Sequence, residues 1–296
     1  MELSRDRLVM WQILKFLPRK LLSRITGLIV HWRGPRPFVT ALILDFAAFY
    51  TIRVADAELP VEKYASLGDF FVRRLKPGLR PVAPALVVHP ADSRIFQSGA
   101  IGDGGECILA KGKKYSVGDL LVDPEWRQKY AGGYFISYYL CPTDYHRVHS
   151  PVEGWINKIT YVPGDLWPVH AEAVASIDSL YCVNERVAVE LATEHGAVSV
   201  VFVGATNVGS IVLDCEPSLK TNRGQPAMTK IFETPVEVAK GQELGMFRMG
   251  STVVCIFSEE YTKRFAEGLN LGPVVKVNSA LTKDLPDRNT PSTESP

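Results

Sequence analysis

From about residue 60 onward, the chain consists of short runs rich in β-branched and aromatic residues, separated by Gly, Pro and Asp. Such runs between turn residues are typical of β-strands. Helical patterns are few in this part of the chain and cover residues 66–75 and 117–131. We therefore expect an α+β fold with a mostly antiparallel β core. The strand-like runs are ALVVHP, GYFISYYL, WINKITYVP, RVAVELA, AVSVVFVG, GSIVLD and TVVCIF.

The first 40 residues are basic, although the whole chain carries a net charge of +1. They contain eight Lys or Arg and two acidic residues, which gives this segment a charge of +6 and leaves the remainder at −5. Such an asymmetry favours a basic arm that meets an anionic surface. The basic residues are Arg5, Arg7, Lys15, Arg19, Lys20, Arg24, Arg33 and Arg36.

Three short helices are expected in this arm. The clearest apolar stripe begins after Pro18 and ends before Gly34-Pro35, which suit a helix start and a helix stop. A similar stripe covers residues 10–17, and residues 38–50 are almost wholly apolar. Basic amphipathic helices suit a bilayer interface, although a helical subdomain packed on the core fits the same pattern. The main stripe consists of Leu21, Leu22, Ile25, Leu28, Ile29 and Trp32.

These sequence patterns divide the chain into a helical membrane-association segment at 1–60, a β-rich core at 61–280 and a polar, disordered tail at 281–296. No uncharged apolar run reaches the ~18 residues of a spanning helix, and the N-terminus lacks the features of a signal peptide. Five scattered cysteines without a C-x-x-C pair favour reduced thiols in a cytoplasmic protein over a disulfide framework or a zinc ribbon.

Two histidines, His146 and His149, stand three residues apart in CPTDYHRVHSPVEG. This spacing occurs in metal sites on helices, but Pro142 and Pro151 argue against a long helix here. No Cys or Glu lies at a matching position, so a metal site is not expected. The structural alternative is a pair of polar side chains in a turn before a strand.

Gly-Ser-Thr at 250–252 interrupts the apolar run FRMGSTVVCIF. Hydroxyl groups inside a buried strand cost free energy unless they find partners. Ser251 is a candidate nucleophile that requires a base, and its surroundings are not the G-x-S-x-G of an α/β-hydrolase. Asp92, His149 and Ser251 can form a triad, because that arrangement does not depend on chain order. The spacing alone does not prove this triad.

Several blocks follow one another along the chain: SLGDFFVRRLKPGLRP, HPAD, AKGKKYSVGDLL, PTDYHRVHSP, YVPGDLW, NERV, VGATNVGSI and KGQELGMFRMGST, which ends in MGST. In this order they closely resemble the bacterial, membrane-associated phosphatidylserine decarboxylases. The resemblance runs from the basic arm to about residue 258 and covers most of the chain. Ser93 stands where the family often has Gly, and Met249 stands where Leu is common. If position 93 requires a positive φ, Ser93 is modestly strained there.

The resemblance implies self-cleavage between Gly250 and Ser251 into a β chain of residues 1–250 and an α chain of residues 251–296. Ser251 would attack the Gly250 carbonyl, with His149 as the base and Asp92 orienting and stabilising its imidazole. Elimination of the resulting ester would leave dehydroalanine, which hydrolyses to a pyruvoyl group and ammonia. The cofactor would therefore be pyruvate derived from Ser251.

The same resemblance implies that the pyruvoyl group forms a Schiff base with phosphatidylserine and accepts electrons as carbon dioxide leaves. His146 matches a second histidine of the family motif. It would return a proton to the substrate or bind its carboxylate, for which a pKa near neutrality is suitable; the neutral alternative is that it only shapes the pocket. The expected partners are phosphatidylserine and the protein's own second chain, with further homo-oligomerisation left open and no nucleic acid. The expected location is peripheral, on the cytoplasmic face of the inner membrane.

Two other functions fit the residues without the resemblance. The first is a membrane-surface hydrolase that uses Ser251, His149 and Asp92 without self-cleavage. The second is a non-enzymatic β-rich module that binds anionic lipid. Both predict an intact chain, whereas the decarboxylase predicts two.

Overall fold

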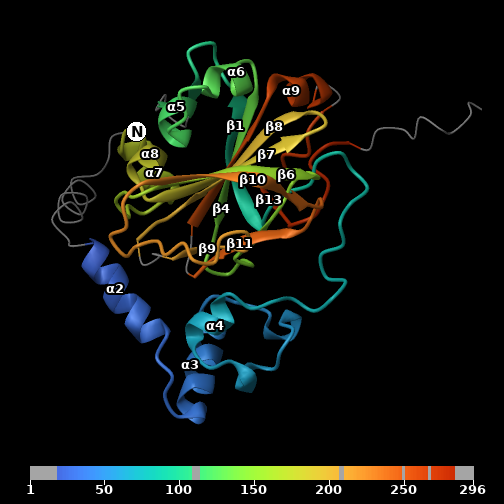
Figure 1. The fold of residues 1–296 in the computed structure, drawn as a ribbon. Helices are drawn as coiled ribbons and strands as arrows, with labels where there is room; N and C mark the ends of the chain where they lie inside the picture. Colours follow the sequence, from blue (N-terminus) through green and yellow to red (C-terminus); the bar gives the residue numbers. More distant parts are fainter. Residues whose placement is uncertain (1–18, 109–113, 207–209, 249–250, 266–267, 284–296) are drawn as a thin grey trace, which may run out of the picture.

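The computed structural model describes residues 19–108, 114–206, 210–248, 251–265 and 268–283. Its centre is an eight-stranded antiparallel sheet with the strand order β10-β6-β7-β8-β12-β4-β1-β13 (Figure 1). This arrangement confirms the predicted α+β class with a mostly antiparallel core. The strands are β1 (Ser93–Ala100), β4 (Tyr134–Leu140), β6 (Gly154–Val162), β7 (Arg186–Thr193), β8 (Gly196–Val203), β10 (Met228–Val238), β12 (Ser251–Phe257) and β13 (Val274–Val275).

Both faces of this sheet are buried, which explains why its central strands are continuously apolar. Successive side chains of a strand point to opposite faces. In β12, Val253 and Cys255 belong to one hydrophobic core, whereas Val254 and Ile256 belong to the other. The apolar run at the end of FRMGSTVVCIF therefore reflects a strand that is covered on both sides.

Different elements cover the two faces. Short helices supply apolar residues to the core that contains Val254. A three-stranded sheet in the order β5-β11-β9 supplies residues to the opposite core, together with the helix α9 (Glu259–Phe265). A two-stranded ribbon joins β2 and β3. These elements are α5 (Val117–Leu121), α6 (Trp126–Tyr130), α7 (Ala171–Ser176), α8 (Leu180–Val183), β5 (Arg147–His149), β9 (Ile211–Leu213), β11 (Glu243–Phe247), β2 (Glu106–Ile108) and β3 (Lys114–Ser116).

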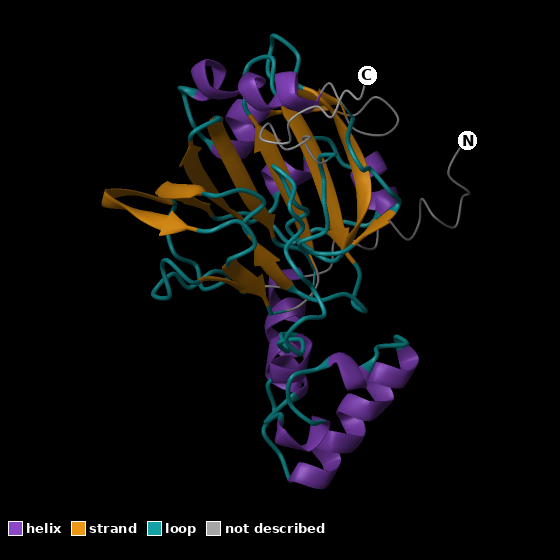
Figure 2. Cartoon of the chain, turned by 90° about the vertical axis from the view of Figure 1, so that its right-hand side faces the viewer, coloured by secondary structure: helices purple, strands orange, loops and turns teal. Residues whose placement is uncertain are grey.

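The N-terminal helices form a unit that projects from the β core (Figure 2). Ten buried residues between Val30 and Phe70 give this unit a hydrophobic core of its own. The first two described helices confirm the helices predicted after Pro18 and over residues 38–50, whereas the stripe at 10–17 lies outside the described residues. The elements are α2 (Arg19–Val30), α3 (Arg36–Phe49), α4 (Leu67–Phe71) and the 3-10 turns η1 (Val54–Asp56) and η2 (Val61–Lys63).

None of the helices in the described segments is long and apolar enough to cross a bilayer.

One predicted strand is absent from the described structure. The run ALVVHP is buried, but it contributes only an isolated bridge between Val88 and Ala280. Pro84 precedes the run and Pro90 ends it, and proline cannot donate to a β-ladder. At the other end of the chain, Leu281 is fully buried although it lies in the predicted disordered tail. Residues 284–296 of that tail lie outside the described residues.

Candidate active site

Position 251 begins a central strand of the sheet. The strand β12 lies between β8 and β4, and residue 251 pairs with Leu140, the last residue of β4. The strand predicted from TVVCIF is therefore confirmed. Met249 and Gly250 lie outside the described residues, so the predicted scissile bond meets the described chain at the first residue of β12.

The segment that follows β4 contains both predicted histidines, His146 in the loop after a turn and His149 at the end of β5. Asp144 holds this turn, because its Oδ2 accepts a hydrogen bond from the Cys141 backbone N–H at 2.8 Å, and its own N–H donates to the Cys141 carbonyl at 2.9 Å. Asp is favoured in turns because it makes such local hydrogen bonds. The turn leads into β5, which ends at His149 and pairs with β11. The Phe247 N–H donates to the His146 carbonyl at 3.0 Å, four residues before position 251.

His149 has the protonation pattern of a base. Its Nδ1 donates to the Gly241 carbonyl at 2.7 Å, because a carbonyl oxygen only accepts hydrogen bonds. Nε2 of the neutral ring therefore carries a lone pair, and the Tyr145 hydroxyl donates to it at 3.3 Å. Burial lowers the pKa of His149 below its usual value. The ring is thus neutral at pH 7, with Nε2 able to accept a proton.

His146 is enclosed more completely than His149. Its side chain is fully buried and stacks on Phe71 with the ring centroids 4.1 Å apart. Nε2 donates to the Cys141 carbonyl at 3.0 Å, whereas Nδ1 has no hydrogen-bond partner within the described part of the chain. Burial lowers the pKa of His146 to about 3. The near-neutral pKa expected from the sequence is therefore not found in this structure, because the surrounding apolar groups disfavour the charged ring.

Asp92 is an ionised carboxylate in a buried network. It is 2% exposed and accepts hydrogen bonds from Arg80 Nε at 2.9 Å, Arg80 Nη2 at 2.6 Å, Lys276 Nζ at 3.2 Å and the Val277 N–H at 2.9 Å. Burial raises the pKa of Asp92, but the hydrogen bonds and charges of Arg80 and Lys276 lower it overall. Removing one partner of such a buried pair costs about 3 to 5 kcal/mol.

The expected hydrogen bond between Asp92 and His149 is not made among the described residues. The carboxylate is taken up by Arg80, Lys276 and Val277, and the imidazole is oriented by a backbone carbonyl instead. The two side chains nevertheless line neighbouring cavities of about 230 and 240 Å³, which share Arg80 and Tyr145. The structure thus brings Asp92 and His149 into one region and gives each a different set of partners.

Sequence reasoning missed several charged residues of this region. Arg80 and Arg73 lie within SLGDFFVRRLKPGLRP, a block that indicates the family but gives no role to either side chain. Lys276 stands in no motif, and its approach to Asp92 depends on the pairing of β13 with β1. That pairing joins Ser93 to Val275. The backbone φ of Ser93 is not positive, so position 93 does not require the glycine that is common in the family.

The cysteines and the possible metal ligands of the described residues do not meet the needs of disulfide or metal sites. All five cysteines are free thiols. Within the described ranges, no group of three His, Cys, Asp or Glu side chains is placed to bind a metal ion. The predicted site residues themselves supply a hydroxyl, two imidazoles and a carboxylate.

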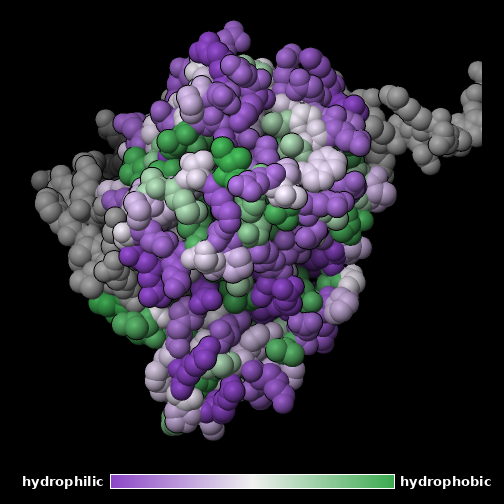
Figure 3. Space-filling view, viewed as in Figure 1, coloured by the Kyte–Doolittle hydropathy of each residue, from purple (hydrophilic) through white to green (hydrophobic). Residues whose placement is uncertain are grey.

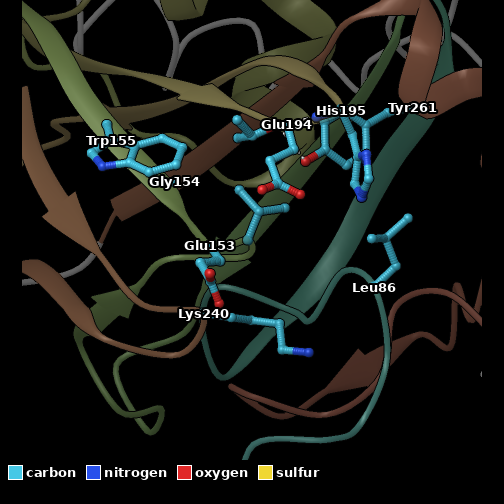
Figure 4. Close-up of a pocket in the computed structure, with 10 residues that line it drawn as sticks. Leu86, Glu153, Gly154, Trp155, Glu194, His195, Lys240 and Tyr261 are labelled. Atoms are coloured by element: carbon cyan, nitrogen blue, oxygen red, sulfur yellow. Dashed lines mark hydrogen bonds between the residues drawn. The ribbon is translucent and has the colours of Figure 1, made fainter.

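A further cavity of about 230 Å³ lies elsewhere, beside the start of β6 and the turn between β7 and β8 (Figure 4). Glu153, Glu194, His195 and Lys240 line it together with Trp155. None of the predicted site residues lines this cavity. It is therefore separate from the region of Asp92 and the two turn histidines.

Comparison with known proteins identifies relatives over most of the chain. The family model described as phosphatidylserine decarboxylase matches residues 67–283. A phosphatidylserine decarboxylase proenzyme of Anaeromyxobacter sp. (strain K) is 41% identical over 256 residues, which are 85% of this chain and 90% of the relative. The proenzyme of the same name from Myxococcus xanthus (strain DK1622) is 40% identical over 83% of this chain and 88% of the relative. The proenzyme of the same name from Shewanella sp. (strain MR-4) is 38% identical over 89% of this chain and 92% of the relative.

Proposed function

Because the chain belongs to the phosphatidylserine decarboxylase family and is an enzyme of this type, we propose that it processes itself and then converts phosphatidylserine to phosphatidylethanolamine and carbon dioxide in phospholipid biosynthesis. The observation that carries the proposal is the geometry of His149. Its Nε2 carries the lone pair of a neutral ring, and His149 ends β5, which follows the strand whose last residue pairs with position 251. The word proenzyme in the relatives' names supports self-processing.

Self-processing needs one proton acceptor and one nucleophile from this chain. His149 Nε2 takes the Ser251 hydroxyl proton, and the oxygen attacks the Gly250 carbonyl. The Gly250–Ser251 amide bond breaks as an ester forms, and the proton goes to the released amine. Elimination then leaves Gly250 as a carboxylate and residue 251 as dehydroalanine. Water hydrolyses the latter to a pyruvoyl group and ammonia, so no external oxidant or reductant is required.

The loop after β4 holds an acceptor that suits the amine substrate of a pyruvoyl group derived from Ser251. His146 Nδ1 is an orphaned, buried polar atom there, and it can accept a hydrogen bond from the substrate's ammonium group. The pyruvoyl carbonyl supplies an electron sink for the decarboxylation. His146 presents its lone pair from a fixed ring, held by Phe71 on one side and by the Cys141 carbonyl at Nε2. The protonated amine of the substrate would therefore meet an oriented acceptor.

The two chains are proposed to stay associated as a heterodimer after cleavage. The strand β12 would belong to the α chain, yet it pairs with β8 and β4 on both sides. The β13–β1 pairing and the bond from the Val277 N–H to Asp92 add contacts across the division. A heterodimer of residues 1–250 and 251–296 therefore retains the core of the sheet. Further homo-oligomerisation is left open, and no nucleic-acid partner is proposed.

The test of the proposed function combines intact mass spectrometry with an assay of carbon dioxide release from phosphatidylserine. The purified protein is expected to contain a C-terminal fragment of 46 residues, the difference between 296 and 250, with a carbonyl-reactive N-terminus. Borohydride plus phosphatidylserine is expected to attach the lipid covalently to that fragment. An active sample that contains only the intact chain would contradict self-processing. An intact chain labelled by a serine-directed phosphonate would favour the hydrolase instead.

The helical unit presents apolar side chains to solvent. Leu28 and Phe49 are 76% and 81% exposed, and Arg33 and Arg36 are exposed in the same unit. Figure 3 shows hydrophobic surface at the lower left, where Figure 1 places α2. We propose that this unit binds the membrane peripherally, on the cytoplasmic face that the reduced thiols favour. The exposed apolar residues are Ile25, Leu28, Ile29, Trp32, Phe38, Leu42, Leu44 and Phe49.

The membrane proposal predicts salt-sensitive binding to anionic vesicles. The full chain is expected to float with vesicles that contain phosphatidylglycerol, and to be partly released by 0.5 M salt, at which the Debye length falls below about 8 Å. The double variant Leu28→Ser and Phe49→Ser should float much less. Ile231→Ser, which removes an equally exposed apolar side chain from β10, should float like the wild type. Equal binding to neutral and anionic vesicles would contradict the electrostatic contribution.

A further inference from the structure

Arg73 is a buried cation without an anionic partner. It follows α4 and is 5% exposed, yet it lines the cavity that also holds Asp92. Its Nη2 approaches only the Thr143 carbonyl, at 3.5 Å. Nε and Nη1 have no hydrogen-bond partner in the described part of the chain. A charge buried in this way is strongly unfavourable for folding, so the chain's own contacts do not account for it.

The other cations of this cavity are already paired. Arg80 and Lys276 both bind Asp92, and Arg53 lies 3.4 Å from Asp56 on the exposed rim. Phe70 lies under the Arg73 guanidinium at 5.0 Å, which compensates part of its charge by a cation–π contact but leaves the N–H groups free. Among the described residues of the cavity wall, Arg73 is therefore the cation available to an incoming anion.

Arg73 is also coupled to the candidate active site. Thr143, which it contacts, lies in the turn that carries His146. Phe71, two residues before Arg73, stacks on the His146 ring. The Arg73 charge is close enough to contribute to the lowered pKa of His146. Two orphaned polar groups, a guanidinium and an imidazole lone pair, thus lie in adjacent parts of the site.

We propose that Arg73 binds the phosphodiester of the substrate lipid, an inference that rests on the proposed function. The head group of phosphatidylserine offers two anions. Its carboxylate loses charge in the transition state for decarboxylation, so a cation bound to it would stabilise the ground state more and slow the reaction. The phosphodiester keeps its charge throughout, and the planar guanidinium matches the geometry of phosphate oxygens.

Direct binding tests this assignment without any turnover. The probes are glycerophosphoethanolamine, which has the phosphodiester and no carboxylate, and free serine, which has the carboxylate and no phosphate. In a full-length Ser251→Ala background, Arg73→Met is expected to weaken glycerophosphoethanolamine binding about ten- to hundredfold, the value of a charge-assisted hydrogen bond. Arg73→Lys should lose less, and Arg53→Met, which removes a rim charge, should change binding less than twofold. Serine binding that depends on Arg73, or phosphodiester binding that does not, would overturn the proposal.

Kinetics and stability separate binding from a structural role. In the otherwise wild-type enzyme, Arg73→Met should still give two chains, and should raise KM for phosphatidylserine at least tenfold with kcat within threefold, because uniform binding is lost. Its melting temperature should stay equal or rise, because an unpaired buried charge is removed. A lower melting temperature with an unchanged KM would make Arg73 structural. A wild-type enzyme that releases no carbon dioxide would instead contradict the proposed function, and the binding result would still stand by itself.

Discussion

Ser251→Ala is expected to leave a single chain of 296 residues that folds normally and has no decarboxylase activity. Alanine lacks the hydroxyl that must attack the Gly250 carbonyl, so neither the ester nor the pyruvoyl group can form. The backbone of β12 does not require the side chain, because residue 251 pairs with Leu140 through main-chain groups. Intact mass, circular dichroism and carbon dioxide release check these three points in one preparation.

The matched control is Ser98→Ala, which removes a hydroxyl from β1 of the same sheet, where it accepts a hydrogen bond from Tyr134. This variant should be cleaved completely and remain active, which shows that loss of a serine hydroxyl in the sheet does not itself block processing. A Ser251→Ala protein that still yields a 46-residue fragment, 296 minus 250, would exclude the Ser251 hydroxyl as the nucleophile, because that fragment begins at residue 251. Residual turnover by its intact chain would exclude the pyruvoyl mechanism.

Elements with strong local signals could be predicted from the sequence. The apolar stripe after Pro18 forms α2, and the candidate at residues 66–75 contains α4, where Ser66 caps the helix by accepting from the Asp69 N–H at 3.1 Å. The strand β10 was not predicted. It is an exposed edge strand whose register shifts between Ile231 and Val236, around a proline that cannot donate to the ladder. Its polar and apolar residues therefore do not alternate cleanly.

The sequence was sufficient to predict which residues belong to the candidate site, but not which groups they contact. Asp92 and His149 line neighbouring cavities, and position 251 pairs with the last residue of β4. Residue types in ordered motifs can suggest these residues. The partner of His149 Nδ1 is the carbonyl of Gly241, and a backbone group carries no side-chain signal. The partners of Asp92 depend on the two-residue strand β13, which is too short to show periodicity. These contacts depend on pairing between strands that are far apart in the chain. A single sequence does not show which strands pair.

Replacing the two histidines is expected to block different steps, self-cleavage for His149 and decarboxylation for His146. His149→Ala should remain a single inactive chain, because it removes the neutral base that serves Ser251. In the wild type, cleavage should be fastest above the lowered pKa of His149 and should slow as the pH falls through it, because the protonated ring cannot accept the serine proton. His146→Ala should mature into two chains, because the hydrogen bonds of His149 do not involve His146, which is not needed as that base.

Mature His146→Ala should nevertheless decarboxylate about 10²- to 10⁴-fold more slowly, the usual effect of removing a positioned proton-transfer group. The pKa of about 3 keeps this ring neutral in the free protein, so it begins the reaction as an acceptor at Nδ1 and can return the proton only after taking one up. Borohydride with phosphatidylserine should still attach the lipid to the small chain, which separates substrate capture from turnover. His195→Ala, in the cavity of Figure 4, is the matched control and should be processed and active. Wild-type turnover by fully cleaved His146→Ala would reduce His146 to a packing role against Phe71, and normal cleavage of His149→Ala would remove His149 as the base.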